Sequence, residues 1–219
     1  MKKIRVSIFT INPNEYNSQI LRVLLDSEEV ELSYVFFSKP LNGEKGISNK
    51  LKRLLSFGGF NLIKIFIQKI RVEKKPIIPI KEFKYLRVNS FQEMLEKINQ
   101  QNTDVVLLLN FNKIIPQKFL SKFPNTFNIH PGKLPEVRGV MPVFWTLKEK
   151  IKEGTITIHQ VERGIDTGCV LKEVSVKINE RSYHSLMLQL MNELSFIIIE
   201  VLKMAISDDT KKLKKQDET

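Results

Sequence analysis

Five consecutive aliphatic residues at positions 105–109 constrain the fold of this chain more than any other segment. A short, unbroken apolar run of this kind is typical of a strand that is buried on both faces. Runs rich in β-branched and aromatic residues also occur at 4–10 and 30–38, and segments with apolar residues at helical spacing lie between the runs. This alternation predicts an α/β fold, with a mostly parallel, twisted sheet that helices cover on both faces.

The same patterns predict the remaining helices and strands. Strands are expected at 4–10, 30–38, 83–88, 103–111, 126–130, 155–161 and 170–178. Helices are expected after a cap at Asn17 or Ser18, after a cap at Ser90, and at 116–122, 142–150 and 182–206. Since ligands bind beyond the carboxyl ends of the strands in open α/β sheets, the loops after these strands are the expected places for a site.

Composition limits the class of protein. With 219 residues and 42% hydrophobic content, the chain suits one α/β domain at residues 1–207. The single cysteine, Cys169, excludes an internal disulfide, which fits a reducing compartment. The amino terminus lacks a secretory signal pattern, and no apolar run approaches the roughly 20 residues that cross a bilayer. We therefore expect a cytoplasmic protein.

The net charge of +11 has two interpretations. The excess Lys and Arg residues either serve a nucleic-acid or phosphate partner, or are solvated without a partner. Residues 208–219 are expected to form a flexible, lysine-rich tail. Residues 48–75 mix apolar and basic residues, which predicts a basic amphipathic insert. One interpretation of this insert is a pair of surface helices. The other is a face that makes peripheral contact with membrane lipid or contacts a partner subunit, as in a homodimer.

Three polar residues stand out as candidate catalytic groups. Asn128 and His130 lie two residues apart in a predicted strand, so their side chains point to the same face. Asp166 lies in a turn between two glycines, which allow close approach of the backbone. An amide, an imidazole and a carboxylate together suit proton transfer and stabilisation of a carbonyl oxygen as it becomes anionic. These groups indicate an acyl-transfer site.

Topology brings further polar residues toward this site. Asn110, Phe111 and Asn112 follow the central strand, His130 ends the next strand, and Asp166 follows another. Because ligands bind at the carboxyl ends of strands, we expect these positions to converge at one edge of the sheet. The first strand is followed by neither a Gly-rich dinucleotide fingerprint nor a P-loop.

The other two histidines are expected to be structural. His159 lies in the strand predicted at 155–161, and His184 lies on the surface of the helix predicted at 182–206. The spacing of the three histidines does not match that of a metal site, so we expect no metal ion.

Several short motifs occur in a fixed order along the chain. They are Asn128-Ile129-His130-Pro131, then Leu134-Pro135, Arg138-Gly139 and Pro142, and finally Gly164-Ile165-Asp166-Thr167-Gly168. This ordered pattern resembles that of the folate-dependent formyltransferase family, which includes glycinamide ribonucleotide, methionyl-tRNA and amino-sugar formyltransferases. The resemblance implies a doubly wound, Rossmann-like catalytic domain that takes its formyl group from 10-formyltetrahydrofolate.

The resemblance also implies a role for each candidate catalytic residue. His130 is expected to act as the acid and base, and Asn128 to donate to the carbonyl oxygen. Asp166 is expected to hold His130 protonated and to relay a proton through a water. The chain departs from the family after the motif proline, where many members have Ser and this chain has Gly132.

The resemblance to the family also implies which residues bind the formyl donor and the acceptor. Those expected to bind the formyl-folate are Asn110, Phe111, Asn112, Ile115, Gly164 and Ile165. Those expected to border the acceptor are Arg138, Gly139 and Trp145. In the family, folate binding relies mainly on backbone groups and apolar side chains after the central strand.

Three acceptors compete within the family. A methionyl-tRNA formyltransferase normally has a second, nucleic-acid-binding domain, and this chain ends soon after its last predicted helix, so a nucleic-acid partner is not expected. A glycinamide ribonucleotide enzyme normally has a Gly-rich loop where this chain has Asn12-Pro13-Asn14. We therefore expect a nucleotide-linked amino sugar, used in polysaccharide biosynthesis. Phosphoribosylglycinamide, methionyl-tRNA and an inactive folate-binding homologue are the alternatives.

Overall fold

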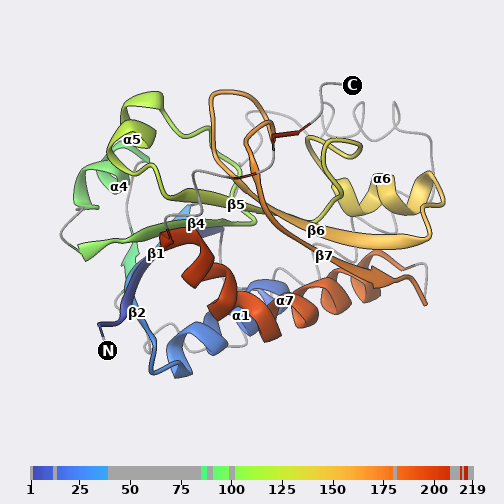
Figure 1. Cartoon of the computed structure of the whole chain (residues 1–219), viewed down its shortest axis with the longest axis horizontal. Helices are drawn as coiled ribbons and strands as arrows, with labels where there is room; N and C mark the ends of the chain where they lie inside the picture. Colours follow the sequence, from blue (N-terminus) through green and yellow to red (C-terminus); the bar gives the residue numbers. More distant parts are fainter. Residues whose placement is uncertain are drawn as a thin grey trace.

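Seven strands form one sheet in the described part of the chain (Figure 1). The computed structural model describes residues 2–11, 14–38, 85–87, 91–98, 102–179, 182–207, 213, 215 and 216. The strands are β1 (Ile4–Ile11), β2 (Val30–Ser38), β3 (Tyr85–Arg87), β4 (Val105–Leu109), β5 (Thr126–His130), β6 (Glu153–Gln160) and β7 (Val170–Lys177). The helices are α1 (Glu15–Asp26), α4 (Phe91–Lys97), α5 (Gln117–Lys122), α6 (Pro142–Lys148) and α7 (Tyr183–Ile206).

The sheet is parallel over most of its width. Its strand order is β3-β2-β1-β4-β5-β6-β7, and the four pairs from β3 to β5 are parallel. The last two pairs, β5–β6 and β6–β7, are antiparallel. The predicted α/β fold with a mostly parallel sheet is therefore confirmed, and the predicted strands lie within a few residues of the observed ones.

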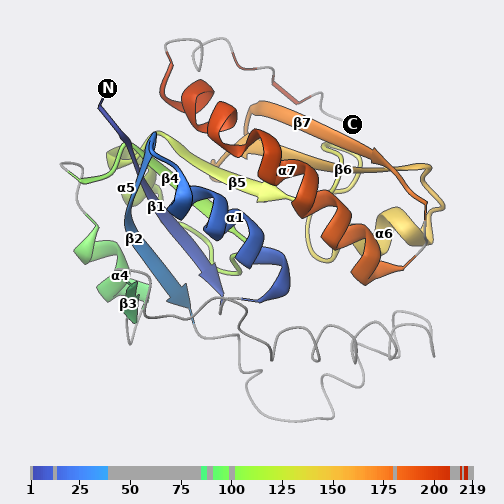
Figure 2. The same ribbon diagram turned by 90° about the horizontal axis from the view of Figure 1, so that it is seen from below.

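Helices cover both faces because the central strand is apolar on both sides. Val105, Leu107 and Leu109 of β4 pack in the core with α1 and α7. Val106 and Leu108 face the other way and pack with α5. Figure 2 shows α1 and α7 crossing the near face of the sheet. All five aliphatic side chains are therefore buried, because alternate side chains of the strand enter two different cores on opposite faces of the sheet.

The last helix, α7, holds one face of the sheet together. Its buried stripe includes Leu186, Leu190, Leu194 and Ile198, spaced for one face of a helix. This stripe packs in the main core, where α7 contacts α1 and β7. By length and composition alone α7 would also suit a membrane span, which corrects the expectation that no apolar segment approaches that length. Its packing against the sheet is that of a core helix.

The first helix begins earlier than its predicted cap. Asn14 caps α1, since its side-chain oxygen accepts from the backbone N–H groups of Tyr16 and Asn17 at 3.0 Å each. Asn17 and Ser18 instead lie inside the helix and are buried, and the Asn17 amide donates to the Thr10 hydroxyl at 2.8 Å. The predicted cap at Asn17 or Ser18 is wrong because Asn14, one turn earlier, already satisfies the first free N–H groups.

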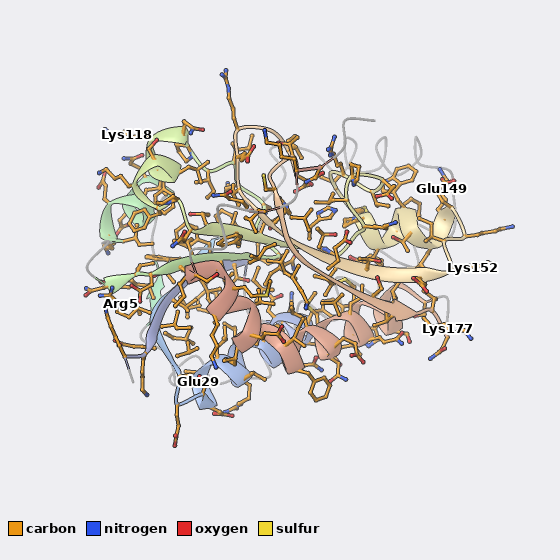
Figure 3. All side chains as sticks on the ribbon, in the orientation of Figure 1. Arg5, Glu29, Lys118, Glu149, Lys152 and Lys177 are labelled. Carbon is orange, nitrogen blue, oxygen red and sulfur yellow. The ribbon has the colours of Figure 1, made fainter. Side chains whose placement is uncertain are left out.

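Two of the predictions fall outside the described residues. These are the helix cap at Ser90 and the basic amphipathic insert at 48–75. Among the residues that the structure describes, Lys118, Lys152 and Lys177 are exposed, and Figure 3 shows them at the periphery of the molecule. At these three positions the basic charge is solvated.

Candidate active site

The candidate catalytic side chains Asn128 and His130 lie on one face of the sheet, because apolar and polar side chains alternate along β5. In β5, Phe127 and Ile129 pack in the core with α7. Asn128 and His130 alternate with them and therefore point to the opposite face. On that face they contact the loop after β5 and the loop after β6. The site is thus built on the sheet face and enclosed by two loops.

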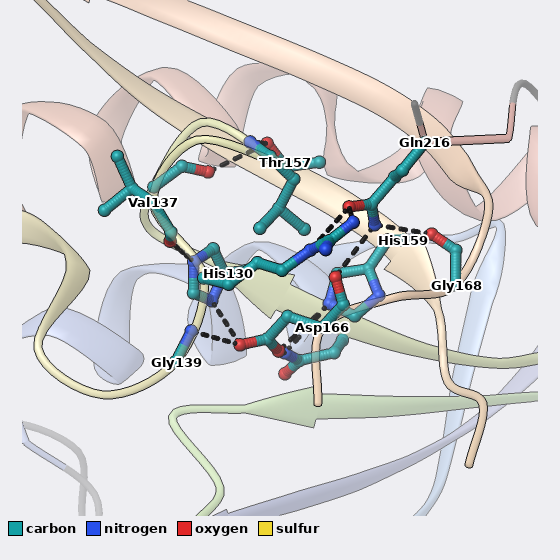
Figure 4. A network of polar contacts seen from close by, with 12 residues as sticks. His130, Val137, Gly139, Thr157, His159, Asp166, Gly168 and Gln216 are labelled. Atoms are coloured by element: carbon teal, nitrogen blue, oxygen red, sulfur yellow. Dashed lines mark hydrogen bonds and ion pairs between the residues drawn. The ribbon is translucent and has the colours of Figure 1, made fainter. Parts of the chain in front are cut away.

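His130 is buried against the loop that follows its own strand. Its Nε2 atom lies 2.7 Å from the carbonyl oxygen of Val137 (Figure 4). A carbonyl oxygen can only accept, so Nε2 carries a proton. In the neutral ring Nδ1 then holds the lone pair, and it lies 3.5 Å from Asp166 Oδ2. Nδ1 is therefore the atom of His130 that can accept a proton from a substrate.

The environment of His130 favours its neutral form. Burial lowers the pKa of His130 below its ordinary value of 6.5, although the Asp166 carboxylate and the bond to Val137 oppose this change. At neutral pH the ring is thus in the form that a general base needs. This corrects the expectation that Asp166 keeps His130 protonated, because burial outweighs the carboxylate.

Asp166 reaches the site by a route different from the expected one. β6 runs antiparallel to β5 and places Gln160 opposite Phe127, so the carboxyl end of β6 lies beside the start of β5. The loop after β6 then turns back over the sheet face, with Asp166 at a φ of 52°. Its Oδ2 accepts from the Gly139 N–H at 2.9 Å, and its Oδ1 accepts from the Asn128 amide at 3.2 Å. Asp166 was expected to reach the site from the carboxyl end of a parallel strand. Instead, the loop after the antiparallel strand β6 brings it back to Asn128 and His130.

Asp166 is ionised in this setting. Burial raises the pKa of Asp166, but contact with His159, the charge of His130 and the Gly139 N–H together bring that pKa below its ordinary value. A carboxylate at this position stabilises a positive charge on His130 Nδ1 once a proton arrives. The left-handed backbone at Asp166 is one that Asp tolerates better than most residues.

His159 belongs to the site, although a structural role was expected for it. Its Nδ1 lies 2.9 Å from the Gln160 carbonyl oxygen, so Nδ1 carries the proton and the neutral ring offers a lone pair at Nε2. Nε2 lies 3.2 Å from Asn128 Nδ2 and 3.4 Å from Asp166 Oδ1. The contact follows from the antiparallel register of β5 and β6, which places His159 opposite Asn128 and which no local sequence pattern indicates.

Both N–H groups of Asn128 are engaged in this arrangement. One bonds Asp166 Oδ1 and the other faces His159 Nε2, each at 3.2 Å. Since a carboxylate only accepts, the nitrogen of the amide must point toward Asp166. Donation from Asn128 to a substrate carbonyl, as expected from the resemblance, therefore requires one of these two bonds to be exchanged.

Two glycines let the enclosing loops approach the site. A Cβ atom at Gly132 would lie 2.6 Å from Pro142 Cβ and 2.9 Å from His130 Nε2. The serine that many family members carry here would not fit this backbone. A Cβ atom at Gly168 would lie 1.8 Å from the backbone oxygen of Gln160. Glycine at both positions follows from this close packing.

Comparison with known proteins places the chain in a family. A family profile described as formyl transferase matches residues 66–202, more than half of the chain. This chain belongs to the formyl transferase family. A methionyl-tRNA formyltransferase of Rickettsia massiliae is 30% identical over 125 residues, which cover 57% of this chain and 39% of that relative. The chain thus spans about two fifths of the length of that curated relative.

Solved structures share the fold at lower identity. A phosphoribosylglycinamide formyltransferase from Anaplasma phagocytophilum is similar with a TM-score of 0.63 and 20% identity, covering 92% of this chain and 86% of that one. The N-formyltransferase from Helicobacter canadensis, solved with folinic acid and dTDP-3-aminofucose, has a TM-score of 0.58 and 16% identity, covering 99% and 68%. These likenesses confirm the Rossmann-like α/β fold of this formyl transferase family member.

The residues expected to bind formyl-folate are placed differently from one another. Asn110 and Asn112 are exposed in the loop after β4, and Gly164 and Ile165 are exposed beside Asp166. The remaining two residues, Phe111 and Ile115, face the core. Phe111 is half-buried against Phe9, at 5.7 Å between ring centroids, and Ile115 is buried in the core on the α5 side. For Ile115 the structure thus shows a packing role, while its neighbour Ile114 is 80% exposed.

The residues expected to border the acceptor also differ in placement. Gly139 lies in the site, with a φ of 87° and its N–H on Asp166. Arg138 is half-buried next to it, and its guanidinium bonds Gln216. Trp145 lies on α6, where its ring packs against Phe144 and under Lys148 Nζ. Acceptor binding by these residues stays a prediction.

Proposed function

We propose that this chain transfers a formyl group from 10-formyltetrahydrofolate to the amino group of a nucleotide-linked amino sugar. One observation carries the transfer step: Asn128, His130 and Asp166 converge on one sheet face, with Asp166 3.2 Å from Asn128 and 3.5 Å from His130. Such a set manages a proton and a developing negative charge without a covalent intermediate.

Proton transfer in this proposal runs through one nitrogen of His130. Nδ1 is unprotonated at neutral pH, because Nε2 donates to Val137 and burial lowers the pKa of the ring. It accepts the proton that the attacking amine loses. The Asp166 carboxylate, 3.5 Å away, stabilises the resulting imidazolium, which then returns the proton to the departing nitrogen.

The loops around the site suit a large, partly apolar donor. Ile114 is 80%, Val140 77% and Ile165 68% exposed, and each lies in a loop that follows one of the strands β4 to β6. Exposed apolar side chains in loops beside a site offer surface that an apolar ligand can cover. A folate ring system offers apolar faces for such side chains, and when bound it supplies the formyl group.

The acceptor is inferred from two observations. The N-formyltransferase solved with dTDP-3-aminofucose shares the fold over 99% of this chain. In this chain β1 is followed by Asn12-Pro13-Asn14 in place of a Gly-rich phosphate loop, and Asn14 is used as the cap of α1. The loop after β1 favours a nucleotide-linked amino sugar over glycinamide ribonucleotide, whereas the fold is shared equally with the phosphoribosylglycinamide formyltransferase and supports either acceptor.

Methionyl-tRNA is the second candidate acceptor. It is favoured by the methionyl-tRNA formyltransferase of Rickettsia massiliae, at 30% identity over 125 residues, and by the net charge of +11.

A panel of amines tests the proposal directly. The protein and 10-formyltetrahydrofolate are incubated with dTDP-3-aminofucose, with glycinamide ribonucleotide or with methionyl-tRNA, and products are scored by mass. We expect the sugar nucleotide to gain one formyl group, and His130→Ala to abolish this gain. Formylation of only glycinamide ribonucleotide or only methionyl-tRNA would overturn the proposed acceptor. Tight folinic acid binding with no product from any amine would identify an inactive homologue.

A further inference from the structure

Gln216 lies beyond the last helix, yet its side chain makes four hydrogen bonds inside the site. Its Nε2 donates to the backbone oxygens of Asp166 at 2.9 Å and Gly168 at 2.7 Å. Its Oε1 accepts from Arg138 Nε at 3.2 Å and Nη2 at 2.8 Å. Figure 4 shows this amide above the turn that carries Asp166. Gln216 belongs to the segment 208–219 that was predicted to be a flexible tail, and the structure places its side chain against the site.

The chemistry of the partners determines the orientation of the Gln216 amide. Backbone oxygens can only accept and a guanidinium can only donate, so the nitrogen must face the turn and the oxygen must face Arg138. Two donors and two lone pairs are then all used, which is the full capacity of a glutamine side chain. Leu213, three residues earlier, packs against the main core and ties this part of the tail to the fold.

Gln216 connects the two loops that enclose the catalytic side chains. Through Arg138 it holds the loop after β5, and through Asp166 and Gly168 it holds the loop after β6. A second link between the same loops is the bond from the Gly139 N–H to the Asp166 carboxylate. Gln216 thus fixes the backbone of Asp166, while Gly139 and Asn128 fix its carboxylate.

We propose that Gln216 is a positioning residue for formyl transfer, which holds the Asp166 turn so that the carboxylate faces His130. The backbone of Asp166 has a positive φ of 52°, a conformation that Asp tolerates better than most residues but that still costs free energy, which surrounding contacts offset. Asp166 lies between β6 and β7, so neither strand pairing nor a helix holds its backbone. The Gln216 amide supplies the missing restraint on the backbone oxygens.

This inference rests on formyl transfer as the activity, and does not depend on the identity of the acceptor. A displacement of about 1 Å of a catalytic group can lower the rate by roughly 100-fold. We therefore expect loss of the Gln216 bonds to lower kcat about 10- to 100-fold, with the KM for 10-formyltetrahydrofolate changed less than about threefold.

Two variants and one control test the proposal in the full-length chain. Gln216→Met keeps the length of the side chain and removes all four bonds. Gln216→Glu keeps the acceptors toward Arg138 and removes both donors to the turn. Lys215→Ala is the matched control, because Lys215 is the exposed neighbour in the same tail. Urea unfolding of each variant shows whether the fold is retained.

Two readouts do not require a known acceptor. The first is the titration of the His130 ring followed by NMR, in which a displaced Asp166 carboxylate lowers the midpoint further below 6.5, since that carboxylate opposes the effect of burial. The second is hydrogen–deuterium exchange of residues 161–169. We expect both Gln216 variants to show a lower His130 midpoint and faster exchange, and Lys215→Ala to match the wild type.

The outcomes separate this inference from the proposed function. An unchanged His130 midpoint together with unchanged exchange in Gln216→Met would overturn the positioning role, whichever acceptor is used. If wild-type protein formylates only glycinamide ribonucleotide or only methionyl-tRNA, the proposed acceptor fails, and the two readouts above still decide the role of Gln216.

Discussion

Asn128 and His159 lie directly opposite each other in the antiparallel pair of β5 and β6, and Asn128 Nδ2 is 3.2 Å from His159 Nε2. The same amide nitrogen is 3.2 Å from Asp166 Oδ1. His159 therefore orients, from within the sheet, the amide that is proposed to stabilise the developing negative charge.

Replacement of this ring tests its contribution. His159→Phe keeps a planar ring and removes the acceptor from Asn128, so we expect kcat for formyl transfer to fall about tenfold or more as the amide loses its orientation. Steady-state kinetics measure the effect. His184→Phe, on α7, removes a hydrogen bond to Tyr16 at 3.1 Å away from the site and serves as control. Equal losses in the two variants would contradict a role for His159 in the site.

The pH dependence of the reaction reports the state of His130. Because burial lowers the pKa of His130, kcat/KM is expected to be on its plateau at pH 7 and to fall only as pH decreases below 6.5, where Nδ1 becomes protonated. Asp166 stays ionised through this range, since its pKa is below the ordinary 3.8. Initial rates between pH 5 and 8 test this, and an acid limb centred above 6.5 would contradict it.

Neutralising the carboxylate tests its charge together with one of its two bonds, because an Asn side chain accepts from either Gly139 or Asn128 but not from both. Asp166→Asn keeps the size of the side chain and removes the charge that raises the pKa of His130. We expect the acid limb of kcat/KM to move to lower pH and kcat to fall by about 100-fold or more. NMR titration of His130 in the variant gives an independent measurement, in which a raised midpoint would be inconsistent with the electrostatic role of Asp166.

Substitutions of Gly164 and Gly168, the two glycines near Asp166, are predicted to differ in their effect on stability and activity. Gly168→Ala places a Cβ atom 1.8 Å from the backbone oxygen of Gln160, so the loop must move, at a cost of about 1–3 kcal/mol and much of the activity. Gly164→Ala meets mainly the side chain of Thr167, which is exposed. Urea unfolding and kinetics of the pair should rank Gly168→Ala as the more damaging, and the reverse order would contradict the loop packing.

The stability of the fold depends on the buried stripe of α7. Leu194 is fully buried in the main core, so Leu194→Ala should lower the free energy of unfolding by about 2–5 kcal/mol. Phe196, two residues further along the same helix, is 76% exposed, and Phe196→Ala should change it by about 0.5 kcal/mol or less. Urea denaturation measures both. Similar values for the two would mean that α7 does not pack as described.

Local patterns were sufficient for most of the fold. The aliphatic run at 105–109 predicted the central strand, because a short, unbroken apolar run is typical of a strand that is buried on both faces. The spacing of Asn128 and His130 predicted that they share a face, since side chains alternate along a strand. These inferences succeeded because they depend on distances of a few residues along the chain.

Contacts between distant segments could only come from the tertiary structure. The direction of β6, the pairing of His159 with Asn128 and the return of the loop that carries Asp166 all depend on how strands pair, which no local pattern encodes. The same holds for Gln216, which lies 50 residues from Asp166 in the sequence and bonds its backbone oxygen. Asn128, His130 and Asp166 were readable from the sequence, whereas His159, Gln216 and the contacts among all of them were decided by packing, because burial and register set which polar groups must pair.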